Sequence, residues 1–298
     1  TGLTAPTHAR GTFIATWTAT DNLGVTGYQT RTKHGAAAWA TPLNQTARSK
    51  VFTLSSGTWT IAVRAKDAAA NWSAWRQMTI SVDASAPVMT RLSAPYLVRS
   101  MDGSFVVSFA ASDNVGVTRY YVRTKKGATG AWSAGQPQSG RSRTFTGLSA
   151  GTWYIGVTAQ DAVGNAASWH VVRVVVPTDD RAYHFSLGTV HLRSAADFKG
   201  TETATSRPGA TMTIKFTGSA FYLIGTTGIH LGRMRVTIDG VSKTVDEGTY
   251  AGRRATTTHH RVLLFAKGLV AGPHTVVITN LGTSGRPTIS VDAIGLRN

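Results

Sequence analysis

The chain has 298 residues, no cysteine, and 31 lysines and arginines against 14 acidic residues, so its formal net charge is +17. The absence of cysteine excludes disulfide bonds, thiol catalysis and thiolate metal sites, and the absence of a long apolar stretch excludes a membrane span. The positive charge favours polyanions such as acidic polysaccharides or teichoic-type polymers, although a general solubilising charge explains it equally well. Because no run of five basic residues occurs, we do not expect nucleic acid as the partner.

One unit occurs twice in the first part of the chain. T-A-T-D-N-L-G-V at Thr18–Val25 returns as A-A-S-D-N-V-G-V at Ala110–Val117. S-G-T-W-T-I-A-V-R-A-K-D at Ser56–Asp67 returns as A-G-T-W-Y-I-G-V-T-A-Q-D at Ala150–Asp161. A self-similar period sets the domain plan, so the sequence predicts two copies of one domain followed by a different third one.

Both copies alternate apolar and polar residues with a period of two. The apolar positions are Phe13, Ala15, Trp17, Trp59, Ile61, Val63 and Ala65 in the first copy, and Phe105, Val107, Phe109, Trp153, Ile155, Val157 and Ala159 in the second. This alternation, bounded by Gly, Asn and Asp, is typical of half-buried strands, and several short strands at this spacing predict an antiparallel sandwich. We expect the aromatic residues to lie in the core, including Trp75 and Trp169.

The last part of the chain is also predicted to be all-β. Its apolar positions alternate in the same way at Met212, Ile214 and Phe216, at Met234, Val236 and Ile238, and at Ile289, Val291 and Ala293. The dipeptide Asp239-Gly240 predicts a tight hairpin turn.

These patterns predict an all-β chain of three tandem antiparallel β-sandwiches at residues 1–83, 87–177 and 178–298. The segments that join them, Asp83–Pro87 and Pro177–Asp180, are short and contain proline, so we expect limited swing between domains.

The stretch L-S-S-G-T-W-T-I-A-V-R-A-K-D-A-A-A-N-W-S-A-W (Leu54–Trp75) resembles the second half of a bacterial fibronectin type III or Ig-like module. In that family a leucine, a Gly-Thr-aromatic segment and a Val-x-Ala-x-Asp strand precede a Gly-Asn turn. The second copy keeps this turn at Gly164-Asn165, whereas the first has Ala70 in place of the glycine. The resemblance implies β-sandwich modules that serve as spacers or adhesive stalks.

The third segment resembles a galactose-binding-like jelly roll in the order of F-T-G-S-A-F, R-V-T-I-D-G, G-P-H-T-V-V-I and S-V-D-A-I between Phe216 and Ile294. The chain thus has two repeats, then the segment Asp179–Ala182, then such a domain. This arrangement is similar to the C-terminal half of exported actinobacterial proteins, including cell-wall hydrolases and peptidases. The resemblance implies a non-catalytic accessory region.

We do not expect catalysis by this chain. G-L-S-A-G at Gly147–Gly151 fits the nucleophile motif G-x-S-x-G, but that motif requires a helix after the serine and a strand is predicted there. An enzyme fragment whose catalytic domain precedes Thr1 is an alternative, since the chain starts without Met and shows no export signal.

The acidic and histidine residues do not form a sequence pattern that predicts a metal site. Asp21, Asp67, Asp113 and Asp161 are expected to cap turns through backbone N–H groups, with a shared Ca²⁺ as the alternative. The adjacent His259 and His260 point to opposite faces of a strand, so one Zn²⁺ cannot use both. Asp292 is expected to be a buried partner for a nearby loop, with a structural cation as the alternative. We expect no cofactor.

Binding is the function that the sequence favours. Candidate ligand-binding residues in the third domain are His230, Arg233, Tyr250, Arg253, Arg254, His259, His260 and Arg286, because arginine forks suit carboxylate, phosphate and hydroxyl groups. The sequence therefore predicts a secreted or cell-surface protein that contacts a surface glycan or anionic wall polymer through this domain. A subunit of a surface fibre, which self-associates, or a spacer without ligand is the alternative.

Overall fold

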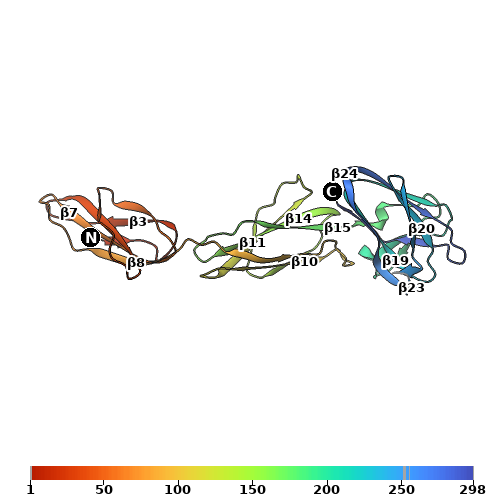
Figure 1. Ribbon diagram of the computed structural model, residues 1–298, viewed down its shortest axis with the longest axis horizontal. Coiled ribbons are helices and arrows are strands. Elements are labelled where there is room, and N and C mark those ends of the chain that lie inside the picture. The colour runs from red at the N-terminus through yellow and green to blue at the C-terminus, as the bar shows by residue number, and fades with distance from the viewer. Residues whose placement is uncertain (1, 251–252, 255, 298) are drawn as a thin grey trace. The chain divides into compact units, whose positions relative to one another are not determined.

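The computed structural model describes residues 2–250, 253–254 and 256–297. Strands make up every part of it, and the helices among the described residues are two 3₁₀ turns, η1 (Asp180–Ala182) and η2 (Phe198–Gly200) (Figure 1). The all-β prediction is therefore confirmed. The chain divides into two compact units. One contains Thr1–Thr90, Ala111–Tyr121 and Thr158–Ser168, and the other contains Arg91–Ala110, Val122–Val157 and Trp169–Asn298.

The first repeat is a two-sheet sandwich. Its strands are β1 (Gly2–Thr4), β2 (His8–Arg10), β3 (Thr12–Thr18), β4 (Val25–His34), β5 (Leu43–Gln45), β6 (Ser49–Thr53), β7 (Gly57–Asp67) and β8 (Arg76–Asp83). One sheet has the order β1-β3-β6 and the other the order β2-β8-β7-β4-β5. Phe13 and Trp17 from the small sheet pack with Tyr28, Ile61 and Ile80 from the large one, as the alternation predicts.

The second repeat has the same plan, and its strands contribute to both compact units. They are β9 (Val88–Ser93), β10 (Phe105–Ser112), β11 (Val117–Lys126), β12 (Gln136–Gln138), β13 (Ser142–Phe145), β14 (Gly151–Asp161) and β15 (His170–Val176). The sheets have the orders β13-β10-β9 and β12-β11-β14-β15. Phe105, Phe109, Ile155 and Val157 are all buried, which confirms their predicted core positions.

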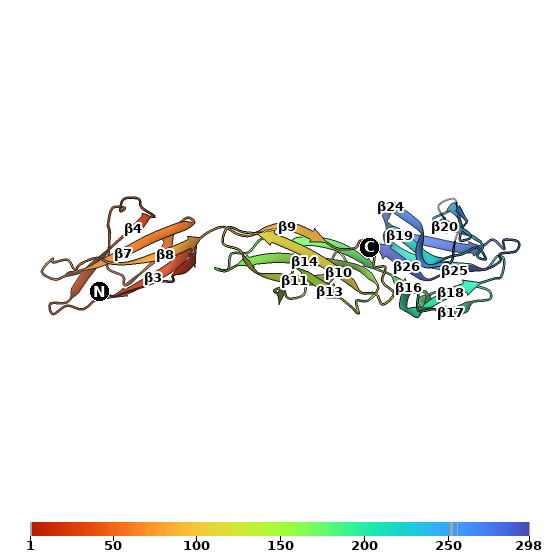
Figure 2. The same ribbon diagram turned by 90° about the horizontal axis from the view of Figure 1, so that it is seen from below.

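The C-terminal part is also a sandwich. Its strands are β16 (Thr178–Asp179), β17 (Val190–Arg193), β18 (Thr201–Thr205), β19 (Thr211–Thr227), β20 (Arg233–Ile238), β21 (Val241–Asp246), β22 (Thr249–Tyr250), β23 (Arg253–Arg254), β24 (Thr258–Asn280), β25 (Ile289–Val291) and β26 (Ala293–Arg297). The sheet β16-β26-β19-β24-β20-β21 faces the sheet β17-β18-β25. In Figure 2, β17 and β18 form the lower layer of this part, with β19 and β24 above them. The jelly-roll connectivity stays a prediction.

The core of this sandwich comes from the alternating positions. Met212 and Ile214 of β19 pack with Met234 of β20 and with Ile289 and Val291 of β25. The predicted hairpin joins β20 to β21, and both turn residues have positive φ angles, 47° at Asp239 and 87° at Gly240. Turns of this kind favour Asn-Gly and Asp-Gly because glycine adopts positive φ without strain.

The segment after Pro177 is built into the C-terminal sandwich and is not a free joint. Thr178 and Asp179 pair with Ile294 and Ala293 of β26, and the fully buried Asp180 carboxylate accepts a hydrogen bond from the Thr201 hydroxyl. One buried cluster in the same compact unit combines Leu97 and Val175 with Phe198, Ala220, Tyr222, Ile224 and Ala293. The expectation of swing at residues 177–180 is therefore wrong.

Candidate functional site

The candidate ligand-binding residues whose side chains are described gather around the ends of β19, β20, β21 and β24 in the C-terminal sandwich. His230 is exposed in the turn that precedes β20, and Arg233 is the first residue of that strand. Arg286 lies in the loop before β25. His259 and His260 lie in strand β24.

Arg233 and Arg286 converge on one carboxylate, Asp246. The Nε atom of Arg233 donates to Oδ2 of Asp246 at 2.9 Å, and Nη1 of Arg286 donates to Oδ1 at 3.0 Å. Burial alone would raise the pKa of Asp246, but the hydrogen bonds from Arg286 and Arg233 outweigh it and hold that pKa below its ordinary value. Arg286 also donates to the carbonyl oxygen of Leu231, so it holds two loops together. Arg233 keeps 55% of its side chain exposed and can also face a ligand.

Tyr250, Arg253 and Arg254 belong to the pair of short strands β22 and β23, in which Tyr250 lies opposite Arg253. Their side chains lie outside the described part of the structure. Their place in a ligand site stays a prediction.

His259 belongs to a carboxylate–imidazole cluster. Its Nδ1 atom lies 2.7 Å from Oδ1 of Asp197 and 3.2 Å from the hydroxyl of Thr226, which donates to Oε2 of Glu202 at 2.6 Å. One ligand atom each from Asp197, Glu202 and His259 lie within 4.8 Å of one another. This mixed nitrogen and oxygen set can hold a divalent cation or a polar ligand group.

The acids of this region are buried, and burial raises their pKa values. Burial raises the pKa of Asp197 and of Glu202, against the opposing hydrogen bonds from His259 and Thr226. It raises the pKa of Glu247 well above the ordinary value, although the backbone N–H of Ser290 donates to this carboxyl group. Sequence reasoning did not predict that these acids would be buried together, because Asp and Glu are mostly exposed in proteins.

His260 is inside the sandwich. Only 3% of its side chain is exposed, its Nδ1 atom lies 2.5 Å from Oδ2 of Asp292, and its ring stacks on Phe198. The other Asp292 oxygen accepts from the Phe198 N–H at 2.7 Å, so Asp292 is the buried loop partner that the sequence predicts. His259 and His260 thus meet separate carboxylates.

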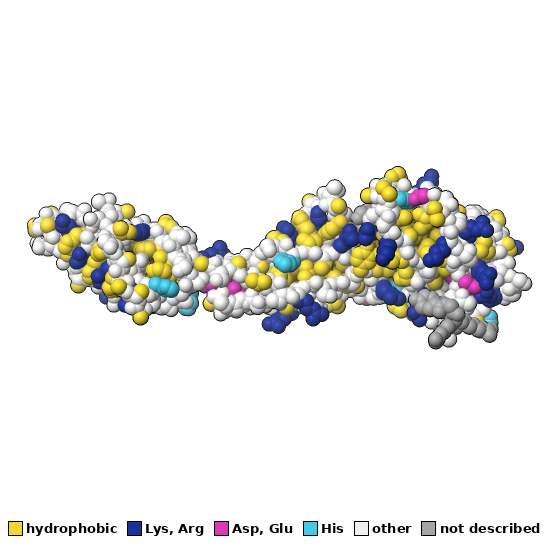
Figure 3. Space-filling model, in the orientation of Figure 1, with side chains coloured by type: hydrophobic (Ala, Val, Ile, Leu, Met, Phe, Trp, Pro, Cys, Tyr) yellow, Lys and Arg dark blue, Asp and Glu magenta, His cyan; other side chains and the backbone are white. Residues whose placement is uncertain are grey.

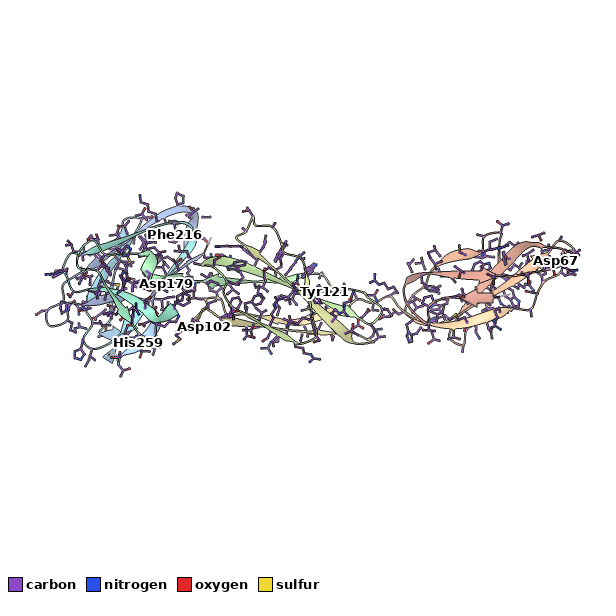
Figure 4. All side chains as sticks on the ribbon, turned by 180° about the vertical axis from the view of Figure 1, so that it is seen from behind. Asp67, Asp102, Tyr121, Asp179, Phe216 and His259 are labelled. Atoms are coloured by element: carbon purple, nitrogen blue, oxygen red, sulfur yellow. The ribbon has the colours of Figure 1, made fainter. Side chains whose placement is uncertain are left out.

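An apolar groove lies in the same sandwich at another place. Its volume is about 580 Å³, and Ile238, Val241, Leu264, Phe265, Leu269 and Val270 are among the residues that line it. His274 lies at its wall, with Nδ1 2.5 Å from Oδ2 of Asp239. His274 contacts Phe216, and Figure 4 shows Phe216 and His259 on opposite sides of this sandwich. Sequence reasoning missed this groove.

The first repeat carries an arginine–tryptophan ladder on the outer face of its large sheet. Arg31 lies between Trp39 and Trp75, with its Cζ atom 4.2 and 4.1 Å from the two ring centres. Arg64 lies between Trp75 and Trp72, 4.6 Å from each ring centre. The expectation that Trp75 is a core residue is therefore wrong.

The second repeat has a shorter ladder that consists of Trp132, Arg123 and Trp169. Trp169 is 36% exposed, so its core assignment is wrong as well. Over the described residues visible in Figure 3, Lys and Arg side chains lie in several small, separate groups.

The G-L-S-A-G segment is a turn that leads into strand β14. The hydroxyl of Ser149 accepts a hydrogen bond from Nζ of Lys126 at 2.9 Å, and its carbonyl oxygen accepts one from the indole of Trp153. The local structure is therefore a sandwich turn, not the strand–turn–helix that a nucleophile requires.

Comparisons with known proteins identify one curated relative. Chitinase A1 from Niallia circulans is 36% identical over 186 residues, which cover 56% of this chain and 25% of that protein. The chain thus spans about a quarter of the length of this relative. No family model matches the sequence.

Solved structures that are similar include fibronectin(III)-like modules of CbhA from Clostridium thermocellum, with a TM-score of 0.40 and 14% identity over 59% of this chain and 94% of that one. The FN1–FN3 domains of chicken CNTN1 give a TM-score of 0.38 and 18% identity over 58% of this chain and 66% of that one. Within the described residues, no helix has the length and apolar character to cross a membrane.

Proposed function

We propose that this chain is a non-catalytic accessory region of an exported polysaccharide hydrolase, and that it attaches to a surface glycan or an anionic wall polymer. The observation that carries the proposal is the 36% identity over 186 residues to part of chitinase A1. The name of that relative favours a carbohydrate polymer as the material that this chain contacts. Its place of action is outside the cell.

The buried acids support a role without catalysis. A hydrolase of glycosides uses two carboxyl groups that reach the substrate. The two glutamates of this chain are Glu202 and Glu247, and both are buried and accept hydrogen bonds from Thr226 and Ser290. The hydrogen bonds of these two glutamates are therefore internal to the sandwich.

The exposed loop edge beside Arg233 is the contact surface in this proposal. His230 and Arg233 are exposed there, and the Asp246 carboxylate orients the guanidinium of Arg233. A fixed guanidinium binds carboxylate, phosphate or paired hydroxyl groups with less loss of entropy than a free side chain. Tyr250, Arg253 and Arg254, whose place in the site stays a prediction, belong to the proposed surface as well.

A sedimentation assay with the full chain tests this function. Chitin and peptidoglycan that carries wall teichoic acid are incubated with the protein at low ionic strength, and free protein is measured. We expect retention on at least one polymer, and Arg233→Ala should weaken it several-fold. Arg235→Ala, an exposed arginine on the same strand, is the matched control and should bind like the wild type.

Salt separates the two ligand classes. Binding to an anionic wall polymer should fall steeply between low and high salt because screening weakens exposed charge pairs, whereas binding to neutral chitin should change little. Absence of retention on every polymer at low salt would contradict the proposal.

A subunit of a surface fibre, which self-associates, is the second candidate. Val241 and Val270 beside the apolar groove are 77% and 83% exposed, and such apolar patches often mark protein contacts. Sedimentation velocity across a hundredfold concentration range decides it, since a pure spacer stays monomeric.

A further inference from the structure

Three aspartates meet where the first repeat ends. Asp83 is the last residue of β8, Asp113 follows β10, and Asp161 is the last residue of β14. One carboxylate oxygen from each lies within 4.8 Å of the other two. All three residues belong to the same compact unit.

Two of the three residues are buried, and the cluster has oxygen atoms that no described group satisfies. Asp83 is 3% exposed and Asp161 is 2% exposed. The Oδ2 atom of Asp83 and the Oδ1 atom of Asp113 are shielded from solvent and have no hydrogen-bond partner among the described residues. A buried carboxylate oxygen without a partner carries a large desolvation cost, so this arrangement calls for a positive group.

The neighbours hold the cluster in place but supply no charge to it. Asn114 donates from its side chain to Oδ1 of Asp83 at 3.2 Å, and Asn165 donates to Oδ2 of Asp161 at 2.7 Å. Arg10 donates to the carbonyl oxygens of residues 163 and 164. None of the three carboxylates forms an ion pair with a described residue.

The first repeat provides an internal comparison. Asp21 and Asp67 hold the positions that match Asp113 and Asp161, and they make the same turn contacts, to the Leu23 N–H and to Asn71. Asp67 lies at the loop end of its sandwich (Figure 4). No third described carboxylate joins this pair. The turn contacts are therefore common to both repeats, whereas the three-carboxylate arrangement forms where Asp83 of the first repeat joins Asp113 and Asp161 of the second.

We propose that Asp83, Asp113 and Asp161 form a Ca²⁺ site that links the end of strand β8 to the loops of the second repeat. The donors are all oxygen atoms, which excludes a preference for Zn²⁺. Ca²⁺ accepts ligands at about 2.3–2.6 Å in variable geometry, and Mg²⁺ demands a tight octahedron at about 2.0–2.1 Å. Three carboxylate oxygen atoms from separate segments of the chain, within 4.8 Å of one another, suit the variable geometry of Ca²⁺, with water completing its coordination.

Calcium titration of the full chain tests the site. After removal of metal with EDTA and dialysis, isothermal titration calorimetry should show one Ca²⁺ per chain, with a dissociation constant of about 10⁻⁴–10⁻³ M, as for extracellular modules. Saturating Ca²⁺ should raise the melting temperature. Asp113→Asn, which keeps the shape of the side chain, should weaken Ca²⁺ binding at least tenfold.

Asp21→Asn is the matched control, because it makes the same change at the equivalent turn of the first repeat and should leave Ca²⁺ binding intact. The wild-type titration decides the question even where a variant fails to fold. No Ca²⁺ binding up to 10-fold above the expected range, or equal binding by Asp113→Asn and the wild type, overturns the site. Equal affinity for Mg²⁺ would overturn the choice of Ca²⁺.

Discussion

Arg123 stacks on Trp169 in the second repeat, with its Cζ atom 3.9 Å from the ring centre. Trp132 covers the other face of the same guanidinium at 4.5 Å. Gly156 lies beneath this stack, where a Cβ atom would come within 3.1 Å of Arg123 and 3.3 Å of Trp132. The corresponding Ala62 of the first repeat is 2% exposed. Small residues on β7 and β14 therefore allow the ladders to lie flat on their sheets.

Replacing Arg123 with alanine removes both stacks. Each cation–π contact contributes about 0.5–1 kcal/mol at an exposed site, so Arg123→Ala should lower the free energy of unfolding by about 1–2 kcal/mol. Urea denaturation followed by tryptophan fluorescence measures it. Arg91→Ala, at an exposed position of β9, is the control and should cost less than about 0.5 kcal/mol. An equal loss in the two variants would show that the stacks add nothing.

His274 should give the C-terminal sandwich a pH-dependent stability. Both ring nitrogens face acceptors, Nδ1 facing Asp239 and Nε2 facing the carbonyl oxygen of Val270 at 2.8 Å. The hydrogen bond to Asp239 raises the pKa of His274 above its ordinary 6.5. Its stabilising contribution is therefore complete below about pH 6.5 and is lost as the pH rises through the folded-state pKa.

Urea denaturation between pH 6 and 9 should accordingly show that the wild type loses stability with rising pH and that His274→Gln loses less. NMR titration of the imidazole supplies the folded-state pKa directly. Identical pH slopes for the two proteins would rule out this linkage.

Adjacent acids at positions 246 and 247 should respond to pH in opposite directions. Burial raises the pKa of Glu247, so the folded state keeps this proton longer than the unfolded chain, and stability falls as the pH rises above about 4.5. Glu247→Gln, which mimics the neutral form, should be more stable than the wild type at pH 7 by more than about 1 kcal/mol.

The pKa of Asp246 is held down by Arg286 and Arg233 against the effect of burial. The stability that the ionised Asp246 contributes to the fold is present above the ordinary pKa of Asp and is lost as the pH falls. Asp246→Asn should therefore be less stable than the wild type at pH 7. Denaturation curves at pH 4 and pH 7 for both variants check the pair. A shift of the same sign in both would contradict these assignments.

His260 and Asp292 form a buried pair, and loss of one partner should be severe. His260→Ala leaves the Asp292 carboxylate without its imidazole inside the core, and breaking such a pair costs about 3–5 kcal/mol. Thermal unfolding measures the loss. His230→Ala, at an exposed turn position, should stay close to the wild type. A loss below about 1 kcal/mol in His260→Ala would show that the pair is not a structural support.

The sequence was sufficient for the strands and their inward faces. The alternation at Phe13, Trp17 and Met212 predicted buried residues, and all three are buried, because one face of each strand meets the opposite sheet. The turn roles of Asp21 and Asp113 were also predictable, since each accepts from the N–H two residues later.

Other features depend on tertiary packing that a pattern does not reveal. Trp75 and Trp169 have large apolar rings, which suggested core positions. Instead they stack on arginines of neighbouring strands at the outer face of the sheet. Arg286 was predicted as a ligand contact, but Asp246 engages its guanidinium. The pairing of His274 with Asp239 joins residues 35 positions apart, and no local motif marks it.

The buried cluster that combines Leu97 and Val175 with Tyr222 and Ala293 matters for the design of fragments. A recombinant piece that starts at residue 178 would leave the rings and methyl groups of this cluster facing water, and bare apolar surface of this kind promotes aggregation. Starting at Arg91 instead keeps the cluster covered. Expression trials that compare the two start points would reveal the difference as soluble yield.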